Sequence, residues 1–364
     1  MLKNIVRNKD YMKRYKYIPG SIPGQKITLF DAITSMDNLR LAYQKAARGK
    51  HKYPEVQQVD SDPERYLVQI RMMLINRTFT TSKYVVFEKI EGNKLRKIYK
   101  LPFFPDRIVQ WAILLVIGPI LERHFIYHTY SSIREKGPLL CMRNVYRAMH
   151  YDPEGTWYYI KIDIKKFYPS INHSILKIKY RRLFKDDDLL WLIDDIIDSL
   201  PIDEGIPIGN YLSQFSGNLY LTDFDHKLSE RVFGVNYYFR YMDDIVIFSD
   251  SKEKLNRIIM NVIVFLSNEK LTLKSNYQIN ESCSDGLDFV GYRIFPDHIL
   301  VRTRIKKHYI QAVKEMLLCR RETAHNRSRY FSYKGFIIHA NSHNLQEKYG
   351  SKLEKLWKNE KTRL

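Results

Sequence analysis

The short run Tyr241-Met242-Asp243-Asp244 constrains this chain more than any other stretch. It lies between two apolar, strand-like runs, residues 237–240 and 245–248, so a tight turn between two strands would expose both acids. An acid pair at a hairpin turn offers the oxygen ligands that Mg²⁺ prefers, usually one or two protein carboxylates together with substrate phosphates. The pattern therefore indicates a divalent-metal site and favours phosphoryl transfer.

Length and charge indicate several subdomains and a polyanionic partner. The 364 residues exceed a usual single domain, and a hydrophobic content of 45% supplies ample cores. The net charge of +20 is concentrated at the ends: residues 1–50 carry eleven Lys/Arg against three Asp/Glu, and residues 301–364 carry sixteen against five. With 27 tyrosines in the chain, this distribution favours a nucleic-acid partner over a merely solubilising surface.

Cysteine usage and hydropathy indicate a protein of a reducing compartment. Cys141, Cys283 and Cys319 are far apart and lack metal-ligand spacing, which predicts neither a disulfide framework nor a zinc site. The longest apolar run, residues 111–121, is shorter than the roughly 20 residues that span a bilayer. The basic N-terminus lacks the apolar stretch of a secretory signal. We expect a soluble, cytoplasmic protein.

Periodicity predicts an α+β order with a mainly antiparallel sheet. Asp31 is expected to cap a helix that reaches Ala47, and Asn172 is expected to cap another helix. Pro119 is expected to kink or break the helix that contains it. Strands are expected at 84–87, 97–101, 157–164, 237–248 (a hairpin), 271–277 and 287–295, and helices at 106–128, 189–200, 213–233, 252–268 and within 302–364.

Four acidic clusters compete for the metal role: residues 186–188, 194–195, 203–204 and 243–244. The first suits a helix N-terminus and the second lies inside an amphipathic helix, so both are interpreted as capping or solvated acids. Asp163 and Asp243 instead end strands, and neighbouring strands would bring their carboxylates together to bridge two metal ions. The alternative for Asp163 is an ordinary turn acid.

Several motifs in this order resemble those of the reverse transcriptases of bacterial retroelements, over about residues 83–295. Residues 239–244 resemble the family's metal-binding hairpin, Asp163 its first-motif aspartate, 106–110 its early finger-to-palm segment, and 287–292 its primer-grip strands. The resemblance implies an α+β right-hand polymerase fold with fingers, a palm (antiparallel sheet with helices on one face) and a small helical thumb. The implied boundaries are 1–80 for a basic helical arm and the start of the fingers, 81–150 for fingers, 151–300 for palm and 301–364 for thumb.

The same resemblance assigns the metal ligands. It makes Asp163 and Asp243 the principal ligands, with Asp244 assisting and the backbone carbonyl of Ile164 completing a coordination shell. The implied cofactor is a pair of Mg²⁺ ions, for which Mn²⁺ can substitute. Such sites act through positioning and charge neutralisation.

Residues for the incoming dNTP also follow from the resemblance. Lys89 and Arg96, on the finger hairpin, resemble the pair that clamps the triphosphate, although Lys94 and Lys97 are close rivals. Tyr168 resembles the bulky residue that excludes a ribose 2′-hydroxyl. Phe167 competes for that role, although a core position is the better interpretation of it. Lys274 is a candidate general acid for pyrophosphate, with a solvated strand-edge lysine as the alternative.

The segment from Ile206 to Gln214 departs from the common retroelement pattern, which has Gln before the Gly and Pro after the Ser. Here those positions are Ile208 and Gln214, a pattern that resembles reverse transcriptases of diversity-generating retroelements. Those enzymes copy a template-repeat RNA with misincorporation opposite adenine. An apolar Ile208 in place of a polar contact would weaken nucleotide discrimination; its alternative role is packing within the palm.

The resemblance also implies partners: template RNA and cDNA, dNTPs, a basic oligomeric accessory protein, a structured retroelement RNA, and no membrane. Two alternatives remain open: an antiphage-defence or retron-type reverse transcriptase, and a non-catalytic RNA-binding protein of the same fold. The implied thumb residues that grip the nucleic-acid backbone are Arg302, Arg304, Lys306, Lys307, Arg320 and Arg321.

Overall fold

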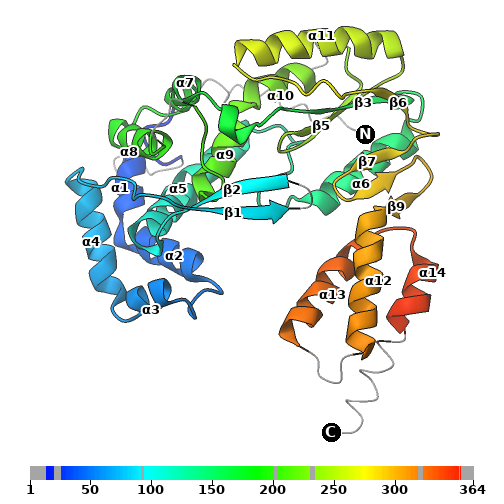
Figure 1. Cartoon of the computed structure of the whole chain (residues 1–364). Helices are drawn as coiled ribbons and strands as arrows, with labels where there is room; N and C mark the ends of the chain where they lie inside the picture. The colour runs from blue at the N-terminus through cyan, green and yellow to red at the C-terminus, as the bar shows by residue number, and fades with distance from the viewer. Residues whose placement is uncertain are drawn as a thin grey trace. The chain divides into compact units, whose positions relative to one another are not determined.

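The computed structural model describes residues 14–19, 26–91, 94–200, 204–229, 234–318, 323–351 and 353. The chain forms two compact units, and it enters each of them more than once (Figure 1). The first unit contains the residues up to Tyr127 together with Ile164–Lys227 and Val262–Leu273; the second contains His128–Asp163, Leu228–Asn261 and the chain from Lys274 onward. The division into fingers, palm and thumb stays a prediction.

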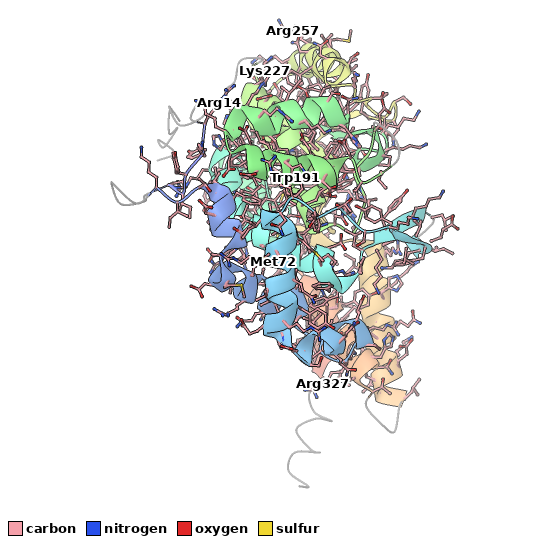
Figure 2. All side chains as sticks on the ribbon, turned by 90° about the vertical axis from the view of Figure 1, so that its left-hand side faces the viewer. Arg14, Met72, Trp191, Lys227, Arg257 and Arg327 are labelled. Carbon is pink, nitrogen blue, oxygen red and sulfur yellow. The ribbon has the colours of Figure 1, made fainter. Side chains whose placement is uncertain are left out.

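The first unit is mainly helical. On α4 (Pro63–Ile75) the residues Leu67, Ile70 and Leu74 are buried, whereas Met72 is half exposed and points away from the helix (Figure 2). Its elements are α1 (Leu29–Thr34), α2 (Met36–Ala47), α3 (Pro54–Asp60), α4 (Pro63–Ile75), strands β1 (Val85–Glu91) and β2 (Lys94–Lys100), α5 (Ile108–His124), α7 (His173–Leu183), α8 (Asp187–Ile197), α9 (Tyr211–Tyr220), most of α10 (Thr222–Ser229) and the end of α11 (Lys252–Asn268).

Helix α5 forms the centre of this unit. Together with the preceding turn it spans Phe103–His124, which among the described residues is long and apolar enough to cross a bilayer, although 61% of its most apolar window is buried in the protein. It packs against α1, α2 and α9. Pro119 does not end it, and the helix stops at His124 rather than at residue 128, because Phe125 is extended. Burial of this kind is typical of a core helix.

The N-terminal helical region corrects the predicted cap. The stretch forms two helices, and Thr28 rather than Asp31 caps the first one. Asp31 is instead the third residue of a capping box: the Thr28 hydroxyl accepts from the Asp31 N–H at 3.0 Å, and the Asp31 carboxylate accepts from the Thr28 N–H at 3.3 Å. Ser35 separates the helices because its extended backbone ends α1 while its hydroxyl caps α2.

Other caps are as predicted. The Asn172 side chain accepts from the Ile175 N–H at 3.2 Å and begins α7, and Asp186 accepts from the Leu189 N–H at 3.3 Å and begins α8. Asp195 differs from the prediction of a solvated acid, because it accepts hydrogen bonds from both the backbone and the hydroxyl of Thr81, at 2.8 and 2.7 Å.

Three further element predictions need correction. The helix expected over 213–233 is two helices, α9 and α10, and residues 230–233 lie outside the described residues. The strand expected at 271–277 is reduced to a single bridge between Ile164 and Leu273. Residues 287–295 form two short strands, because Val290 (φ 42°) and Gly291 (φ 96°) make a tight turn between them.

The strands of the second unit pair antiparallel, as the sequence predicts, but they form two sheets rather than one. A four-stranded sheet has the order β4-β5-β3-β6, and a three-stranded sheet has the order β7-β8-β9. Helix α6 packs its apolar face on both, in a core shared by Val145, Phe248 and Tyr292. The remaining elements of the unit are α6 (Pro138–Tyr151), β3 (Tyr158–Asp163), β4 (Tyr237–Tyr241), β5 (Asp244–Ser249), the start of α11, β6 (Ile279–Glu281), β7 (Leu287–Phe289), β8 (Tyr292–Ile294), β9 (Ile299–Val301), α12 (Thr303–Leu318), α13 (Ala324–Ile337) and α14 (His343–Leu345).

Candidate active site

The register of the four-stranded sheet brings the predicted carboxylates together. β3 and β5 are antiparallel, and Asp163 is the direct cross-strand partner of Asp244. β4 and β5 pair through Tyr241 and Asp244, so Met242 and Asp243 form a two-residue turn. Met242 has a φ of 58°, a region that favours glycine, so this turn holds local backbone strain of the kind that clusters at functional sites.

Arg240 supports this turn from inside the protein, a role that the sequence analysis missed. Its side chain has no exposed surface, and its Nη1 donates to the carbonyl oxygen of Met242 at 3.1 Å. Its backbone N–H donates to the carbonyl oxygen of His128 at 3.0 Å, and the Tyr130 N–H donates back to its carbonyl at 3.1 Å. A buried guanidinium bonded to the turn backbone fixes the position of the adjacent acids.

Two lysines face the carboxylates. Lys274 Nζ forms an ion pair with Asp163 Oδ2, and Lys161 Nζ lies 3.7 Å from Asp244 Oδ1. Lys274 was predicted, whereas Lys161 was not. The signal was present: Lys161 stands two residues before Asp163 on the same strand, and side chains at that spacing share one face of a sheet. Lys161 also donates to the carbonyl oxygen of Asp288 at 3.2 Å.

The electrostatics of the carboxylates fit a divalent cation. Burial raises the pKa of Asp243, and the negative charges of Asp163 and Asp244 raise it further, while Lys274 opposes them. The Oδ1 atom of Asp163 is buried without a hydrogen-bond partner, which is uncommon because burial of an unpaired polar atom costs free energy. A bound cation would remove that cost. Within the described residues no three acid, His or Cys side chains already converge as a metal site. The oxygen donors of these three aspartates nevertheless suit Mg²⁺.

Ile164 directly follows the first aspartate and is buried. Its neighbour Lys165 donates its N–H to the carbonyl oxygen of Thr272 at 2.8 Å, and Ile164 itself bridges Leu273. On the other side of the unit boundary, the Lys274 N–H donates to the carbonyl oxygen of Asp163 at 3.0 Å. The role of the Ile164 carbonyl as a metal ligand stays a prediction.

The predicted triphosphate clamp lies on the β1–β2 hairpin of the first unit. Lys89 is exposed and is the direct cross-strand partner of Arg96, so the two residues lie side by side on the hairpin. The side chain of Arg96 lies outside the described residues. Tyr168 is half buried beside Phe167, with ring centroids 5.5 Å apart, and Phe167 is buried, as expected for a core aromatic. These roles in dNTP binding stay predictions.

The segment Ile206–Gln214, which departs from the family pattern, forms hydrogen bonds with β2 and with α5 within the first unit. The Tyr99 N–H of β2 donates to the carbonyl oxygen of Ile208 at 3.1 Å. Gln110 Oε1, from α5, accepts from the Tyr211 N–H at 2.8 Å and so satisfies the start of α9. Ile208 is half buried, and Gln214 is exposed in α9. Residues 106–110 stand out in the sequence as a motif, but the order of residues does not show this capping role.

Two of the predicted thumb residues already contact other side chains of the protein. Arg302 forms an ion pair with Asp288, and Arg304 Nε lies 3.5 Å from His308 Nε2. Lys306 and Lys307 are exposed on α12. The remaining two predicted residues, Arg320 and Arg321, lie outside the described residues.

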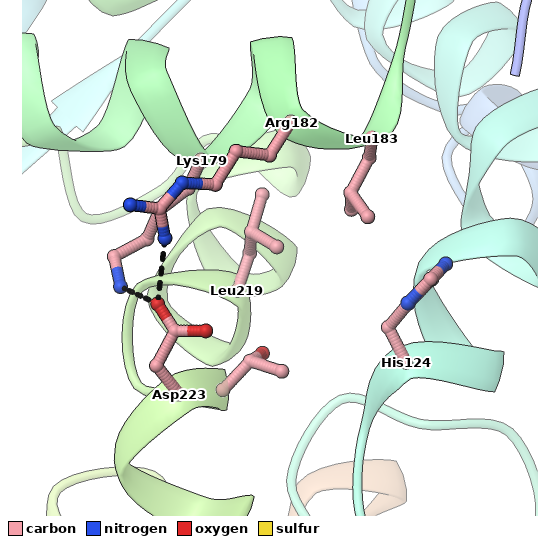
Figure 3. A pocket seen from close by; sticks show the side chains of 7 residues that line it. His124, Lys179, Arg182, Leu183, Leu219 and Asp223 are labelled. Atoms are coloured by element: carbon pink, nitrogen blue, oxygen red, sulfur yellow. Dashed lines mark hydrogen bonds and ion pairs between the residues drawn. The ribbon is translucent and has the colours of Figure 1, made fainter. Parts of the chain in front are cut away.

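A separate charged cluster lines a small cavity of about 70 Å³ in the first unit (Figure 3). Lys179 Nζ lies 2.8 Å from Asp223 Oδ2 and 3.2 Å from Glu269, and Arg182 Nη1 lies 3.2 Å from the same Asp223 oxygen. The two basic residues, Lys179 and Arg182, therefore match the charges of the two acids, Asp223 and Glu269, within the protein. We interpret the cluster as a structural network that ties α7 to α10 and to the end of α11.

The chain matches the family described as reverse transcriptase (RNA-dependent DNA polymerase) over residues 89–294, more than half of its length. It therefore belongs to the reverse transcriptase family and has the mixed α+β fold of right-hand polymerases. The matched stretch includes the three aspartates, Lys161 and Lys274.

Curated relatives agree with this assignment. The chain is 30% identical to Protein YkfC of Escherichia coli K12 over 160 residues, 41% of each chain. It is 25% identical to the Retron Ec73 reverse transcriptase of Escherichia coli, over 48% of this chain and 61% of that protein. A solved apo telomerase from Candida tropicalis is 14% identical with a TM-score of 0.43, over 62% of this chain and 55% of that one. The chain spans less than two thirds of each of these proteins.

Proposed function

We propose that this protein is an RNA-directed DNA polymerase that extends a primer by two-metal phosphoryl transfer. The observation that carries the proposal is the pairing of Asp163 with Asp244, with Asp243 at the adjacent turn, in a chain of the reverse transcriptase family. When bound at these carboxylates, two Mg²⁺ ions would activate the primer hydroxyl and neutralise the leaving pyrophosphate.

The aspartates and lysines of the site have different roles in this proposal. Asp163 offers its unpartnered, buried Oδ1 as a ligand, and Asp243 presents a carboxylate whose burial makes a nearby cation favourable. Lys274, paired with Asp163, is the residue that would give a proton to pyrophosphate. Lys161 Nζ lies 3.7 Å from Asp244 Oδ1 and would balance part of the charge of that carboxylate before metal binds.

Primer extension tests this proposal. The purified full chain with poly-rA, an oligo-dT primer, dTTP and Mg²⁺ is expected to make DNA, and Asp243→Ala is expected to make none. Asp250→Ala is the matched control, because Asp250 is an exposed acid beyond the far end of β5 that pairs, among the described residues, with Lys254 of the following helix and with Ser249. A wild-type chain without activity, or an Asp243→Ala variant with normal activity, contradicts the proposal.

Within this activity, we propose error-prone copying of a template-repeat RNA, as in diversity-generating retroelements. The support is local: Ile208 is half buried next to β2 and offers only apolar contact where most related enzymes have glutamine. Loss of a polar partner lowers discrimination against wrong nucleotides. Ile208→Gln is expected to reduce misincorporation opposite template adenine, measured by sequencing cDNA from a defined RNA, with Ile208→Val as the control for packing. Unchanged fidelity in Ile208→Gln would remove Ile208 as the determinant.

The proposed partners follow from this activity. They are the template RNA, its cDNA, dNTPs, a structured retroelement RNA and a basic oligomeric accessory protein, in a cytoplasmic setting. The relationship to a retron enzyme supports a second candidate, a retron-type reverse transcriptase. A pair of repeats near the gene that differ almost only at adenines supports the first candidate, and a neighbouring retron RNA without such repeats supports the second.

A further inference from the structure

Helix α6 has two different faces. Cys141, Met142 and Val145 belong to the face that packs in the core of the second unit. The exposed face carries Arg143, Arg147 and His150, at the i, i+4 and i+7 spacing of one helix face. Tyr146 lies at the edge of this face, half buried against the same core, and Tyr151 follows at the end of the helix. The family-typical motifs do not include this stripe of alternating basic and aromatic residues.

The rings of the stripe are held in place. Tyr146 and His150 stack with ring centroids 5.5 Å apart and planes 19° apart, and Tyr151 meets His150 edge-on at 5.0 Å. His150 Nδ1 lies 2.8 Å from the carbonyl oxygen of Pro296. Because a carbonyl can only accept, Nδ1 carries the proton and the ring is fixed in orientation. Tyr151 is 81% exposed, so its ring offers an open surface.

The stripe continues onto the loop between β8 and β9. Phe295 and His298 stack with centroids 4.4 Å apart and planes 8° apart, and the Arg293 guanidinium lies 5.9 Å from the Phe295 ring. This loop also supplies the carbonyl of Asp297, to which the Tyr146 hydroxyl donates at 3.4 Å. Two stacked aromatic pairs are therefore linked through the loop backbone.

The positive charges of the stripe are available to a ligand. Arg143 and Arg147 are exposed, and among the described residues neither has a hydrogen bond or an ion pair. Asp297, the acid of the adjoining loop, is already paired with His298 at 2.7 Å. Many other exposed basic residues of the chain are neutralised by acids, for example Arg181 by Asp194.

We propose that this face of α6 with the β8–β9 loop, residues 143–151 and 293–298, binds single-stranded nucleic acid outside the active site. Bases would stack on Tyr151 and on the His150 and Phe295 pairs, while Arg143 and Arg147 would contact phosphates. Alternating rings and unpaired guanidinium groups match the repeating bases and phosphates of an unpaired strand, whereas in a duplex the base faces are hidden. The surface would hold an unpaired stretch of template RNA or of product DNA.

Site-specific crosslinking tests this proposal independently of catalysis. The Asp243→Ala protein, without dNTPs, is mixed with single-stranded RNA or DNA of about 12 nucleotides that carries a photoreactive base, or with the same sequence as a hairpin duplex. Crosslinked peptides are then identified by mass spectrometry. We expect labelling within residues 143–151 by the single strands, and the stronger of the RNA and DNA arms identifies the natural strand.

Variants make the test specific. Tyr151→Ala combined with Arg147→Ala is expected to lower α6 labelling about five-fold or more, and Tyr151→Phe is expected to retain it, because only the ring face is used. Arg257→Ala is the charge-matched control, since Arg257 is exposed on α11 of the same unit (Figure 2). Unfolding temperatures confirm that each variant is folded. Labelling confined to other segments, equal labelling by the duplex, or equal labelling in the double variant overturns the proposal.

Discussion

Asp163, the last residue of β3, is the cross-strand partner of Asp244, the first residue of β5. The two acids come from distant motifs, and only the antiparallel register of the sheet puts them side by side. Asp243 stands one residue before Asp244, at the turn, and the negative charges of Asp163 and Asp244 raise its pKa. Three like charges at one sheet edge repel each other, and a divalent cation would relieve that repulsion.

Neutralising one carboxylate is expected to abolish activity without harming the fold. Asp243→Asn should lower the rate of primer extension roughly thousand-fold or more, because several kcal/mol of charge stabilisation are lost. The raised pKa of Asp243 means that its ionised form is disfavoured in the metal-free protein, so the asparagine variant should unfold at the same temperature as wild type or higher.

Metal binding should appear as stabilisation. Mg²⁺ is expected to raise the unfolding temperature of wild type and to have little effect on Asp163→Asn, since a ligand stabilises only the state that binds it. Chelation with EDTA should stop primer extension, and added Mg²⁺ should restore it. Equal stabilisation of wild type and Asp163→Asn by Mg²⁺ would contradict the assignment of Asp163 as a ligand.

The two lysines are expected to differ in function. Both compete with cations for the carboxylates, so Lys161→Met and Lys274→Met should each lower the Mg²⁺ concentration that gives half-maximal activity. If Lys274 supplies the proton to pyrophosphate, its loss should also lower kcat about 100-fold or more, and Lys161→Met should not. The measurement is steady-state extension across a Mg²⁺ series, and similar kcat values in both variants would exclude Lys274 as general acid.

Replacement of Arg240 should loosen the catalytic turn. Arg240→Met removes the donor to the Met242 carbonyl in a fully buried setting and is expected to cost about 2–3 kcal/mol of unfolding free energy. Arg240→Lys should recover part of the stability but less of the activity, because an ammonium group lacks the planar fork of a guanidinium. Urea denaturation and primer extension measure the two effects. Full activity in Arg240→Met would show that the turn does not depend on this residue.

Replacement of Gly209 by alanine is expected to destabilise the protein more than the same replacement of Gly234, because only Gly209 lies against another segment of backbone. Both have a positive φ, but a Cβ at Gly209 would lie 2.5 Å from the carbonyl oxygen of Tyr99, whereas nothing lies within 4 Å of one at Gly234. Gly234→Ala should cost about 1 kcal/mol of backbone strain, and Gly209→Ala clearly more. Denaturant midpoints compare the two, and equal losses would argue against the close approach of β2 to the 208–214 segment.

Much of the site could be predicted because its signals are local. Asp163 and Asp243 end apolar runs, and a strand-end acid is visible in the order of residues alone. Helix caps such as Asn172 and Asp186 could also be predicted from the sequence, because a capping side chain bonds to a backbone group three residues away. The predicted cap at Asp31 was wrong by three residues because Thr28 and Asp31 share one capping box.

Contacts between distant segments were not readable from the sequence. Nothing in the order of residues shows that Gln110 satisfies the start of α9, that Arg240 lies beneath the turn, or that β2 crosses Gly209. Each is a pairing between elements, and many pairings are compatible with the same pattern. The sequence by itself determined the strand-end acids, the family motifs and the basic ends. Only the tertiary structure decided which lysine faces which aspartate and what holds the turn, because strand register and packing fix those distances.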